Sequence, residues 1–395
     1  MPLFYSRDTI RHICVIPGVV FCSLLTLLMM VHSADAGLSN TTLLSGGIAL
    51  AAQPPTKLQA HSCPNAVKAP SYWSTLVGTQ QGVSHVEHVL CDKLLGDASP
   101  QALITVRHNG DAVLLDVYVY THISNPHPTL LFSTKGLPKG DATISAYTTL
   151  LIGEADRLAL INEGKTDQQL TQDLYREFRW SSTEKRFAQI TFPGMFPDMT
   201  RYQAEIDQQK IKHGLDLWKR NATDVAVAAA RQFFAWKRTT TTNITSGGGA
   251  SDMAATIRVT QAPAPSTAIP ESTVMMQLSR LEGRAGNIWE VTAIKSNGTL
   301  KLTSPPNGSK VFSPLHITGS GSSFEGIVGM AFVLDHLSLE IGHASASGKG
   351  DSFQADVKYR STVNDPVHEE GIVAVFSLSA ADGSVSTAVM EKVLL

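Results

Sequence analysis

Short β-favouring segments recur along the C-terminal quarter of this chain, with turn signals between them. They lie at residues 315–318, 327–334, 338–344, 353–359, 372–379 and 387–394. Within one segment, Phe353, Ala355, Val357 and Tyr359 alternate with polar residues, which is the period-two pattern of a strand with one buried face. Regular short strands without a helical pattern predict an all-β sandwich over residues 304–395.

The predicted sandwich is expected to fold around its own core. The residues expected to supply that core are Ile317, Phe332, Phe353, Val357, Phe376 and Val393. A linker is expected before it at Pro305-Pro306-Asn307-Gly308, because neither proline nor an Asn-Gly pair continues a central strand. Residues 304–395 are therefore predicted to be an independent domain.

Several short motifs in this region follow one another in a recognisable order. They are Pro305-Pro306-Asn307-Gly308, Phe324-Glu325-Gly326, Gly371-Ile372-Val373-Ala374-Val375-Phe376 and Asp382-Gly383-Ser384. This order resembles the immunoglobulin-like domain of bacterial spore-germination proteins and other Gram-positive surface proteins. The resemblance implies an extracellular β-sandwich that is appended to other modules, and it implies no catalytic activity.

Glu325 lies between Phe324 and Gly326, at the expected start of a strand and within the family motif. A carboxylate at this place can bind a ligand, or it can accept backbone N–H bonds and fix the entry into the strand. The structural role is the favoured interpretation. Glu325 is nevertheless the candidate binding residue of the sandwich.

The chain has 395 residues, which is too long for one ordinary core, so about two to four domains are expected. Residues 72–205 are predicted to form the first, an α+β or β-rich domain. Asn109-Gly110 predicts a hairpin, since both residues tolerate the backbone angles of a tight turn. The expected elements are strands at 102–107, 112–121, 129–133 and 188–192 and a helix at 167–178.

Residues 206–303 combine a helical pattern with a set of strands. Apolar residues recur every three or four positions between Gln203 and Trp236. Gly214 and Asn221 weaken the middle of this pattern, which leaves open two helices or one bent helix. A polar linker at 239–249 and antiparallel strands at 253–259, 273–281 and 288–295 are expected next. This order predicts an α+β roll, weakly similar to cystatin or nuclear-transport-factor-2-like folds.

The N-terminus has the features of an export signal. Arg7 and Arg11 precede an apolar segment at 13–31, and Ala34-Asp35-Ala36 supplies small residues where signal peptidase cuts. Residues 1–36 are therefore predicted to be a signal peptide. The alternative is an uncleaved membrane anchor, because the apolar segment approaches the length that spans a bilayer. Residues 37–71, rich in Ser, Thr, Gly, Ala and Pro, are predicted to be a flexible spacer.

Cleavage of the signal would leave two cysteines, Cys63 and Cys91. In an oxidising compartment two such thiols form a disulfide, and two unpaired thiols are the alternative. Cys91 also ends the pattern His85-x-x-His88-x-x-Cys91, whose residue types suit zinc. A disulfide would remove Cys91 as a ligand, so no metal is predicted, and His85 and His88 are the candidates if one binds.

No catalytic motif is present in the sequence. It lacks a G-x-S-x-G elbow, a phosphate-binding loop and an H-E-x-x-H pair, and no cofactor is predicted. Trp218 and Trp289 are expected in the core rather than on a binding surface. The formal net charge of −2 argues against nucleic acid as a partner.

These observations predict an exported, non-catalytic binding or structural protein of the bacterial cell envelope or extracellular space. Its partner would be an envelope component, a polymer or another protein. The alternative is a secreted hydrolase with its site in residues 72–303. A deep pocket lined by close titratable groups would favour the enzyme, and pockets confined to domain seams would favour binding.

Overall fold

The computed structural model describes residues 63–395 except 111–112, 264–270, 284–285, 323–326, 364–367 and 380–381. The predicted signal peptide, most of the predicted spacer and Glu325 lie outside the described residues. The described part of the chain is mostly β, with three α-helices. No helix within it is long and apolar enough to cross a bilayer.

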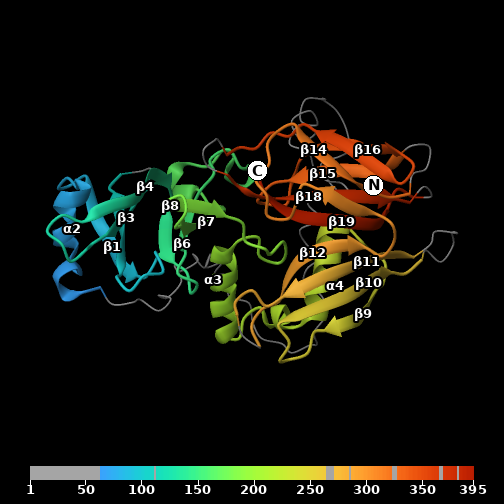
Figure 1. Ribbon diagram of the computed structural model, residues 1–395, viewed down its shortest axis with the longest axis horizontal. Helices are drawn as coiled ribbons and strands as arrows, with labels where there is room; N and C mark the ends of the chain where they lie inside the picture. The colour runs from blue at the N-terminus through green and yellow to red at the C-terminus, as the bar shows by residue number, and fades with distance from the viewer. Residues whose placement is uncertain are drawn as a thin grey trace, which may run out of the picture.

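Two four-stranded antiparallel sheets make up the N-terminal module, at one end of the molecule (Figure 1). The first contains β1 (Ser84–Asp92), β2 (Gln101–His108), β3 (Leu114–Thr121) and β4 (Thr129–Pro138). The second contains β5 (Asp141–Ile144), β6 (Leu150–Glu154), β7 (Leu174–Ser181) and β8 (Arg186–Ile190). In each sheet the strands are paired in the order in which they occur along the chain, so every connection is local.

The first sheet confirms the predicted hairpin and the predicted disulfide. Strands β2 and β3 pair antiparallel on either side of Asn109-Gly110. Cys63 is bonded to Cys91 of β1, beside helix α2 (Pro70–Val77), whose Trp73 is fully buried. Disulfides form and persist in oxidising compartments, which is consistent with an extracytoplasmic protein.

The helix predicted at 167–178 is wrong. The structure has a short 3₁₀ turn at Asp167–Gln169 and then strand β7. Strand β7 pairs with β6 on one side and with β8 on the other. Pairing on both edges and the aromatic residues Tyr175, Phe178 and Trp180 favour a strand more than local helical propensity favours a helix.

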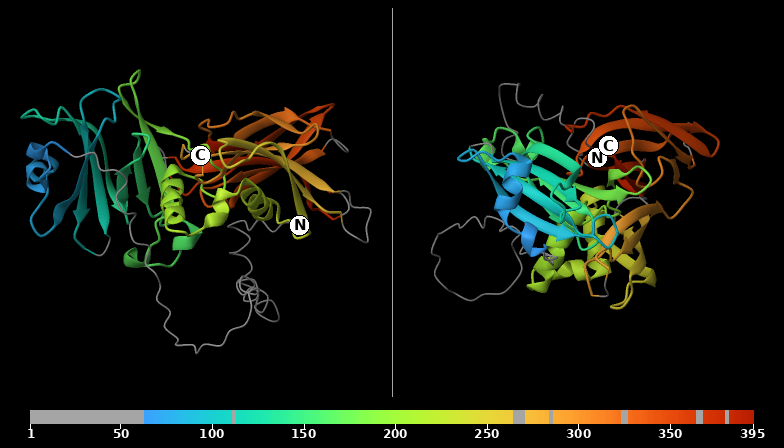
Figure 2. Two further views of the ribbon diagram at one scale, coloured as in Figure 1. Left: turned by 90° about the horizontal axis from the view of Figure 1, so that it is seen from below. Right: turned by 60° about the vertical axis from the view of Figure 1, so that its left-hand side comes forward.

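The helical pattern after the N-terminal module resolves into two helices, α3 (Arg201–Lys212) and α4 (Ala222–Phe234). Gly214 has a φ of +80°, a value that glycine adopts readily and that ends the first helix. The Asn221 side chain accepts hydrogen bonds from the backbone N–H groups of Thr223 and Asp224, which is an N-cap. Helix α3 lies between the N-terminal module and the rest of the chain (Figures 1 and 2).

The remaining strands form one eleven-stranded antiparallel sheet. They are β9 (Thr240–Gly247), β10 (Ala254–Gln261), β11 (Ser272–Ser279), β12 (Glu290–Ser296), β13 (Lys301–Ser304), β14 (Leu315–Ser320), β15 (Ile327–Leu334), β16 (Glu340–Lys349), β17 (Ser352–Val357), β18 (Glu370–Leu378) and β19 (Val385–Leu394). Their order in the sheet is β13-β14-β17-β16-β15-β18-β19-β12-β11-β10-β9. The predicted polar linker at 239–249 is instead largely edge strand β9, because its threonines favour a strand and pair with β10.

We refer to helix α4 with β9–β12 as the roll and to β13–β19 as the sandwich. Strand β12 of the roll pairs with β19 of the sandwich at Ile294 and Met390. Strand β13 pairs with β14, so the sandwich begins before residue 304. The roll and the sandwich therefore share one continuous sheet and are not separated by a linker at this point.

Strand β18 is buried on both faces. Val373 and Val375 face the sandwich core together with Ile317, Phe353, Val357 and Val393. Phe332 and Phe376, which were predicted to lie in that core, instead face α4 and the roll strands. A strand with two apolar faces carries no alternation signal, so the sequence pattern does not reveal which side each residue takes.

Candidate functional site

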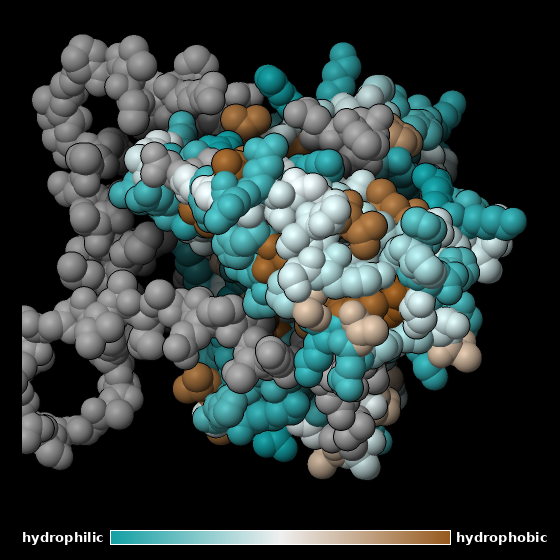
Figure 3. Space-filling model, turned by 90° about the vertical axis from the view of Figure 1, so that its left-hand side faces the viewer, coloured by the Kyte–Doolittle hydropathy of each residue, from teal (hydrophilic) through white to brown (hydrophobic). Residues whose placement is uncertain are grey.

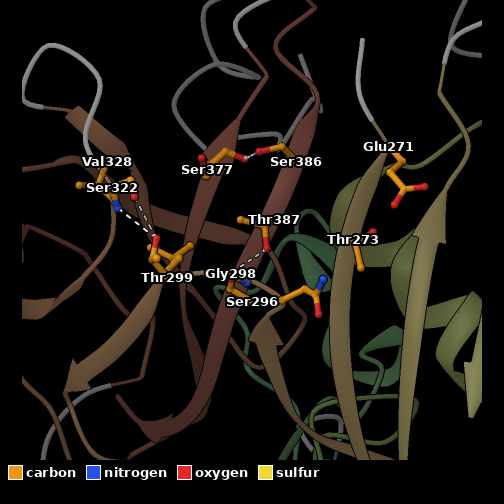
Figure 4. A pocket seen from close by; sticks show the side chains of 12 residues that line it. Glu271, Thr273, Ser296, Gly298, Thr299, Ser322, Val328, Ser377, Ser386 and Thr387 are labelled. Carbon is orange, nitrogen blue, oxygen red and sulfur yellow. Dashed lines mark hydrogen bonds between the residues drawn. The ribbon is translucent and has the colours of Figure 1, made fainter. Parts of the chain in front are cut away.

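An open groove of about 400 Å³ lies at the seam between the roll and the sandwich (Figure 4). Strands β11 and β12 and Glu271 just before β11 supply one side. The β12–β13 turn, Ser322 after β14, Val328 of β15 and the ends of β18 and β19 supply the rest. The residues that line it are Glu271, Thr273, Ser296, Asn297, Gly298, Thr299, Leu300, Ser322, Val328, Ser377, Ser386 and Thr387.

Side-chain hydroxyl groups dominate the surface of this groove. Thr387 Oγ1 donates to Ser296 Oγ at 3.0 Å, and Thr299 Oγ1 lies 3.1 Å from Ser322 Oγ. Each hydroxyl has one donor and two acceptor sites, so these contacts leave capacity for a ligand. Glu271 is the one titratable side chain among the lining residues. The groove is therefore suited to hydrogen-bonding a polar ligand and offers no acid–base pair.

A second groove, of about 270 Å³, lies beside the start of α4. Arg280 and Arg220 line it, and backbone carbonyls hold both, since Nε of Arg280 donates to Asp252 O and Nε of Arg220 donates to Gly286 O. The Arg280 guanidinium lies 4.1 Å from the ring centroid of Trp289.

Trp289 is fully buried, as predicted, but Trp218 is 37% exposed. Trp218 lies in the 3₁₀ turn between the two helices, outside the apolar face on which a continuous helix would have placed it.

A buried lysine of the sandwich, which also pairs with Glu370 of the sandwich, contacts the segment before α3. The side chain of Lys392 is 0% exposed. Its Nζ donates to the carbonyls of Gly194 and Met199, at 2.9 and 2.6 Å, and lies 3.5 Å from Glu370 Oε2. Burial raises the pKa of Glu370 to about 7, against the attraction of Lys392. This contact fixes β18 and β19 to the preceding segment.

A second charged cluster lies around Arg201 of α3. Its Nε lies 2.9 Å from Glu177 Oε1, and its NH1 lies 3.3 Å from Glu282 Oε1. Burial raises the pKa of Glu282 and of Glu205 to about 7. Carboxylates with such pKa values are candidates for acid–base work, but none of these residues lines either groove.

His336 connects the turn between β15 and β16 to the N-terminal module. Its Nδ1 is hydrogen-bonded to Glu369, and its Nε2 lies 3.3 Å from Asp173 Oδ2. Burial opposes the charged form of His336, but the bonds to Asp173 and Glu369 outweigh it and raise the pKa to about 10. The ring therefore links the turn between β15 and β16 to the N-terminal module through hydrogen bonds on both of its nitrogens.

The two histidines predicted as metal candidates lie on the exposed side of β1. A bulge separates Val86 from His88, and the side chains of His85 and His88 are both exposed. Cys91 is bonded to Cys63 and is not available as a ligand. The predicted pattern therefore keeps two possible metal ligands, His85 and His88, and lacks its cysteine.

The buried charges were not found from the sequence. The one visible signal was their position: Asp335-His336 directly follow the apolar strand β15, and Glu369-Glu370 stand at the start of β18. Their partners lie far away along the chain, as with Lys392 and Gly194. Only the folded topology brings them together.

Hydrophobic residues at the surface are scattered rather than gathered. At the N-terminal end of the molecule they form several separate patches between hydrophilic residues (Figure 3). Single exposed apolar residues are normal on soluble domains. On the face shown, the exposed apolar side chains of the described residues do not merge into one patch (Figure 3).

Comparisons with known proteins found one similarity, to a protein family, and it lies within the sandwich region. A search of curated proteins and a search of solved structures both found no match. The match to a protein family begins at the β12–β13 turn and ends before β19. Residues 299–384 match the immunoglobulin-like domain of bacterial spore germination.

Proposed function

We propose that this chain is an exported, non-catalytic binding protein of the bacterial envelope or extracellular space, which holds a polar partner in the seam groove. The observation that carries the proposal is the composition of the groove. Hydroxyl and amide side chains from two structural units converge there, with one carboxylate among them. A ligand rich in hydroxyl or amide groups, such as a cell-wall polymer, matches that surface.

The location of the groove supports binding over catalysis. Ligand sites occur preferentially where structural units meet, and this groove has one wall from the roll and another from the sandwich. None of its twelve lining residues is aromatic, so sugar stacking is not part of the recognition. Contacts would be hydrogen bonds, which implies modest affinity per site and a long or repeated ligand.

The buried ionic links supply the rigidity that such a groove needs. Lys392 and His336 connect the sandwich to the segment before α3 and to the N-terminal module. Pre-organised walls lose little conformational entropy when a ligand binds. The disulfide and the family of the sandwich support an extracytoplasmic location for the same protein.

A secreted hydrolase remains the second candidate, and one observation favours it. Glu205 and Glu282 have raised pKa values beside Arg201. An enzyme that uses them would lose its activity in Glu205→Gln and Glu282→Gln. The binding proposal predicts that neither substitution changes ligand retention.

The experiment is co-sedimentation of the mature chain with insoluble peptidoglycan. Thr299 is exposed in the turn that borders the groove, so Thr299→Trp obstructs the groove without disturbing a core. Thr303 is an exposed threonine of β13 that does not line the groove, and Thr303→Trp is the matched control. Binding that is lost in Thr299→Trp and kept in Thr303→Trp supports the proposal. Equal binding by both variants contradicts it.

A further inference from the structure

We infer that Asp335, His336 and Glu369 bind a divalent transition-metal ion that fastens the sandwich to the N-terminal module. One ligand atom from each residue lies within 4.8 Å of the other two. All three side chains are buried, with Glu369 at 0% exposed. Three ligand atoms this close together, from one turn and one strand start, form a compact site away from solvent.

A buried carboxylate oxygen of Asp335 without a hydrogen-bond partner is independent support for a bound cation. Oδ1 of Asp335 accepts from the backbone N–H groups of Leu337 and Leu339, both at 2.9 Å. Oδ2 of the same carboxylate is buried and has no hydrogen-bond partner among the described residues. A buried polar atom without a partner destabilises the folded chain, and a metal ion would satisfy it.

The local charge is also unbalanced. Asp335, Glu369 and Asp173 are three buried carboxylates around one histidine. Within the described ranges no lysine or arginine forms an ion pair with any of the three, and the ion-pair partner of both Asp173 and Glu369 is His336. Two negative charges are thus left without a cation. Buried charges are normally paired or coordinate a metal, and a divalent ion that replaces the His336 proton reduces this excess of negative charge.

The surroundings of the three ligands have the form of an outer shell. Nε2 of His336 faces Asp173 Oδ2 at 3.3 Å, which leaves Nδ1 to the metal once its proton is released. Ser361 Oγ donates to the other oxygen of Glu369. Metal-binding histidines usually donate their second N–H to a carboxylate in this way, and ligating carboxylates are themselves hydrogen-bonded.

The ligand types narrow the choice of ion. Imidazole with two carboxylates suits Zn²⁺ or Mn²⁺, whereas Ca²⁺ and Mg²⁺ prefer oxygen ligands throughout. Asp335 and His336 belong to the β15–β16 turn, Glu369 precedes β18, and Asp173 precedes β7 of the N-terminal module. The ion would therefore stiffen the contact between the two modules.

The test uses the mature chain, stripped with a chelator and titrated with Zn²⁺ alone and then with Mn²⁺ alone. We expect one bound ion per chain and a higher unfolding temperature with metal. Asp335→Asn and Glu369→Gln should abolish stoichiometric binding, and Asp173→Asn should weaken it about 10- to 100-fold. Glu340→Gln, which changes another carboxylate beside a histidine of the same hairpin, is the matched control and should bind as the wild type does.

Two outcomes of the metal titration would contradict the inference. A folded wild-type chain that takes up neither ion overturns the inference. So does equal uptake by Asp335→Asn and Glu340→Gln, which would place the ion on exposed histidines instead. If the variants do not fold, visible absorption of Co²⁺ bound to the wild-type chain supplies the answer: bands of a nitrogen- and oxygen-ligated site support the inference, and the spectrum of aqueous Co²⁺ contradicts it.

Discussion

Phe376 of strand β18 packs edge-to-face against Phe234 of helix α4, with their ring centroids 5.8 Å apart. The strand belongs to the sandwich and the helix to the roll. Both rings are fully or almost fully buried, and the cluster around them contains residues of both units. The sandwich and the roll therefore have a common core, which bears on how each can fold.

Removing this ring should destabilise both units together. We expect Phe376→Ala to lower the free energy of unfolding by about 3–5 kcal/mol, as for other buried aromatic residues. Chemical denaturation followed by fluorescence and by circular dichroism measures it. Val373→Ala, on the opposite face of the strand, is the comparison for the sandwich core. A neutral Phe376→Ala would contradict the shared core.

The two-sided burial of β18 changes the expectation for the isolated sandwich. A fragment of residues 304–395 would expose Phe332, Phe376 and their apolar neighbours and would lack all of β13 except Ser304. We expect no cooperative thermal transition from it, whereas a fragment of residues 206–395 should unfold cooperatively. Differential scanning calorimetry of both fragments decides. A sharp transition in the shorter one would show that the sandwich folds by itself, as its sequence pattern suggested.

The disulfide should stabilise the N-terminal module. Cys63 and Cys91 are separated by 28 residues, and closing such a loop contributes about 3.5 kcal/mol in the chain-entropy model. Replacing both cysteines with serine should lower stability by about that amount, and reduction of the wild type should match it. Thiol titration of the exported, non-reduced protein should find neither thiol free. Two reactive thiols would contradict the bond.

Stability should fall as the pH rises from about 4 to 7. Burial raises the pKa of Glu205 and Glu282 to about 7 in the folded chain, whereas an unperturbed glutamate has a pKa of about 4.3. The folded state thus keeps protons that the unfolded state has lost. Stability from these groups is complete below the unfolded pKa and is lost through the folded one.

Urea denaturation at pH 5 and pH 8 measures this loss, which should be on the order of 2 kcal/mol for each of the two carboxyl groups. Glu282→Gln cannot ionise and should show a smaller decrease between the two pH values. Glu184→Gln, at an exposed glutamate of the β7–β8 turn, is the control and should behave as the wild type. An unchanged decrease in Glu282→Gln would show that this carboxylate does not titrate in that range.

Replacing Lys392 alone should destabilise the protein more than replacing Lys392 and Glu370 together. Lys392→Met leaves a carboxylate buried without its cation, and loss of one partner of a buried pair costs about 3–5 kcal/mol. The double variant with Glu370→Gln should recover part of that loss. A double-mutant cycle of denaturation midpoints measures the difference. A double variant less stable than Lys392→Met alone would contradict this role for the pair.

Local patterns predicted much of the β structure. Strand β15 has the predicted bounds, and the Asn109-Gly110 hairpin followed from turn chemistry. Two separate helices on either side of Gly214 and Asn221 were one of the two alternatives left open. The disulfide followed from the two cysteines left after the apolar segment. These features depend on neighbours in the sequence or on a small number of options.

The features that the sequence did not predict depend on contacts between residues far apart in the chain. Strand β7 has a partner on each edge, which favours a strand where a helix was expected. The side taken by Phe376 depends on helix α4, more than a hundred residues earlier in the chain. The seam groove and the His336 link join units whose contact no local pattern encodes, so neither was predictable as a site.

The most direct test of the central claim is hydrogen exchange of the mature chain with and without soluble peptidoglycan fragments. If the seam groove binds this partner, the backbone amides of the β12–β13 turn and of the ends of β18 and β19 should exchange more slowly in its presence. The Arg201 cluster and strand β1 should be unchanged. Protection around Glu205 and Glu282 with none at the groove would contradict the account and favour the hydrolase.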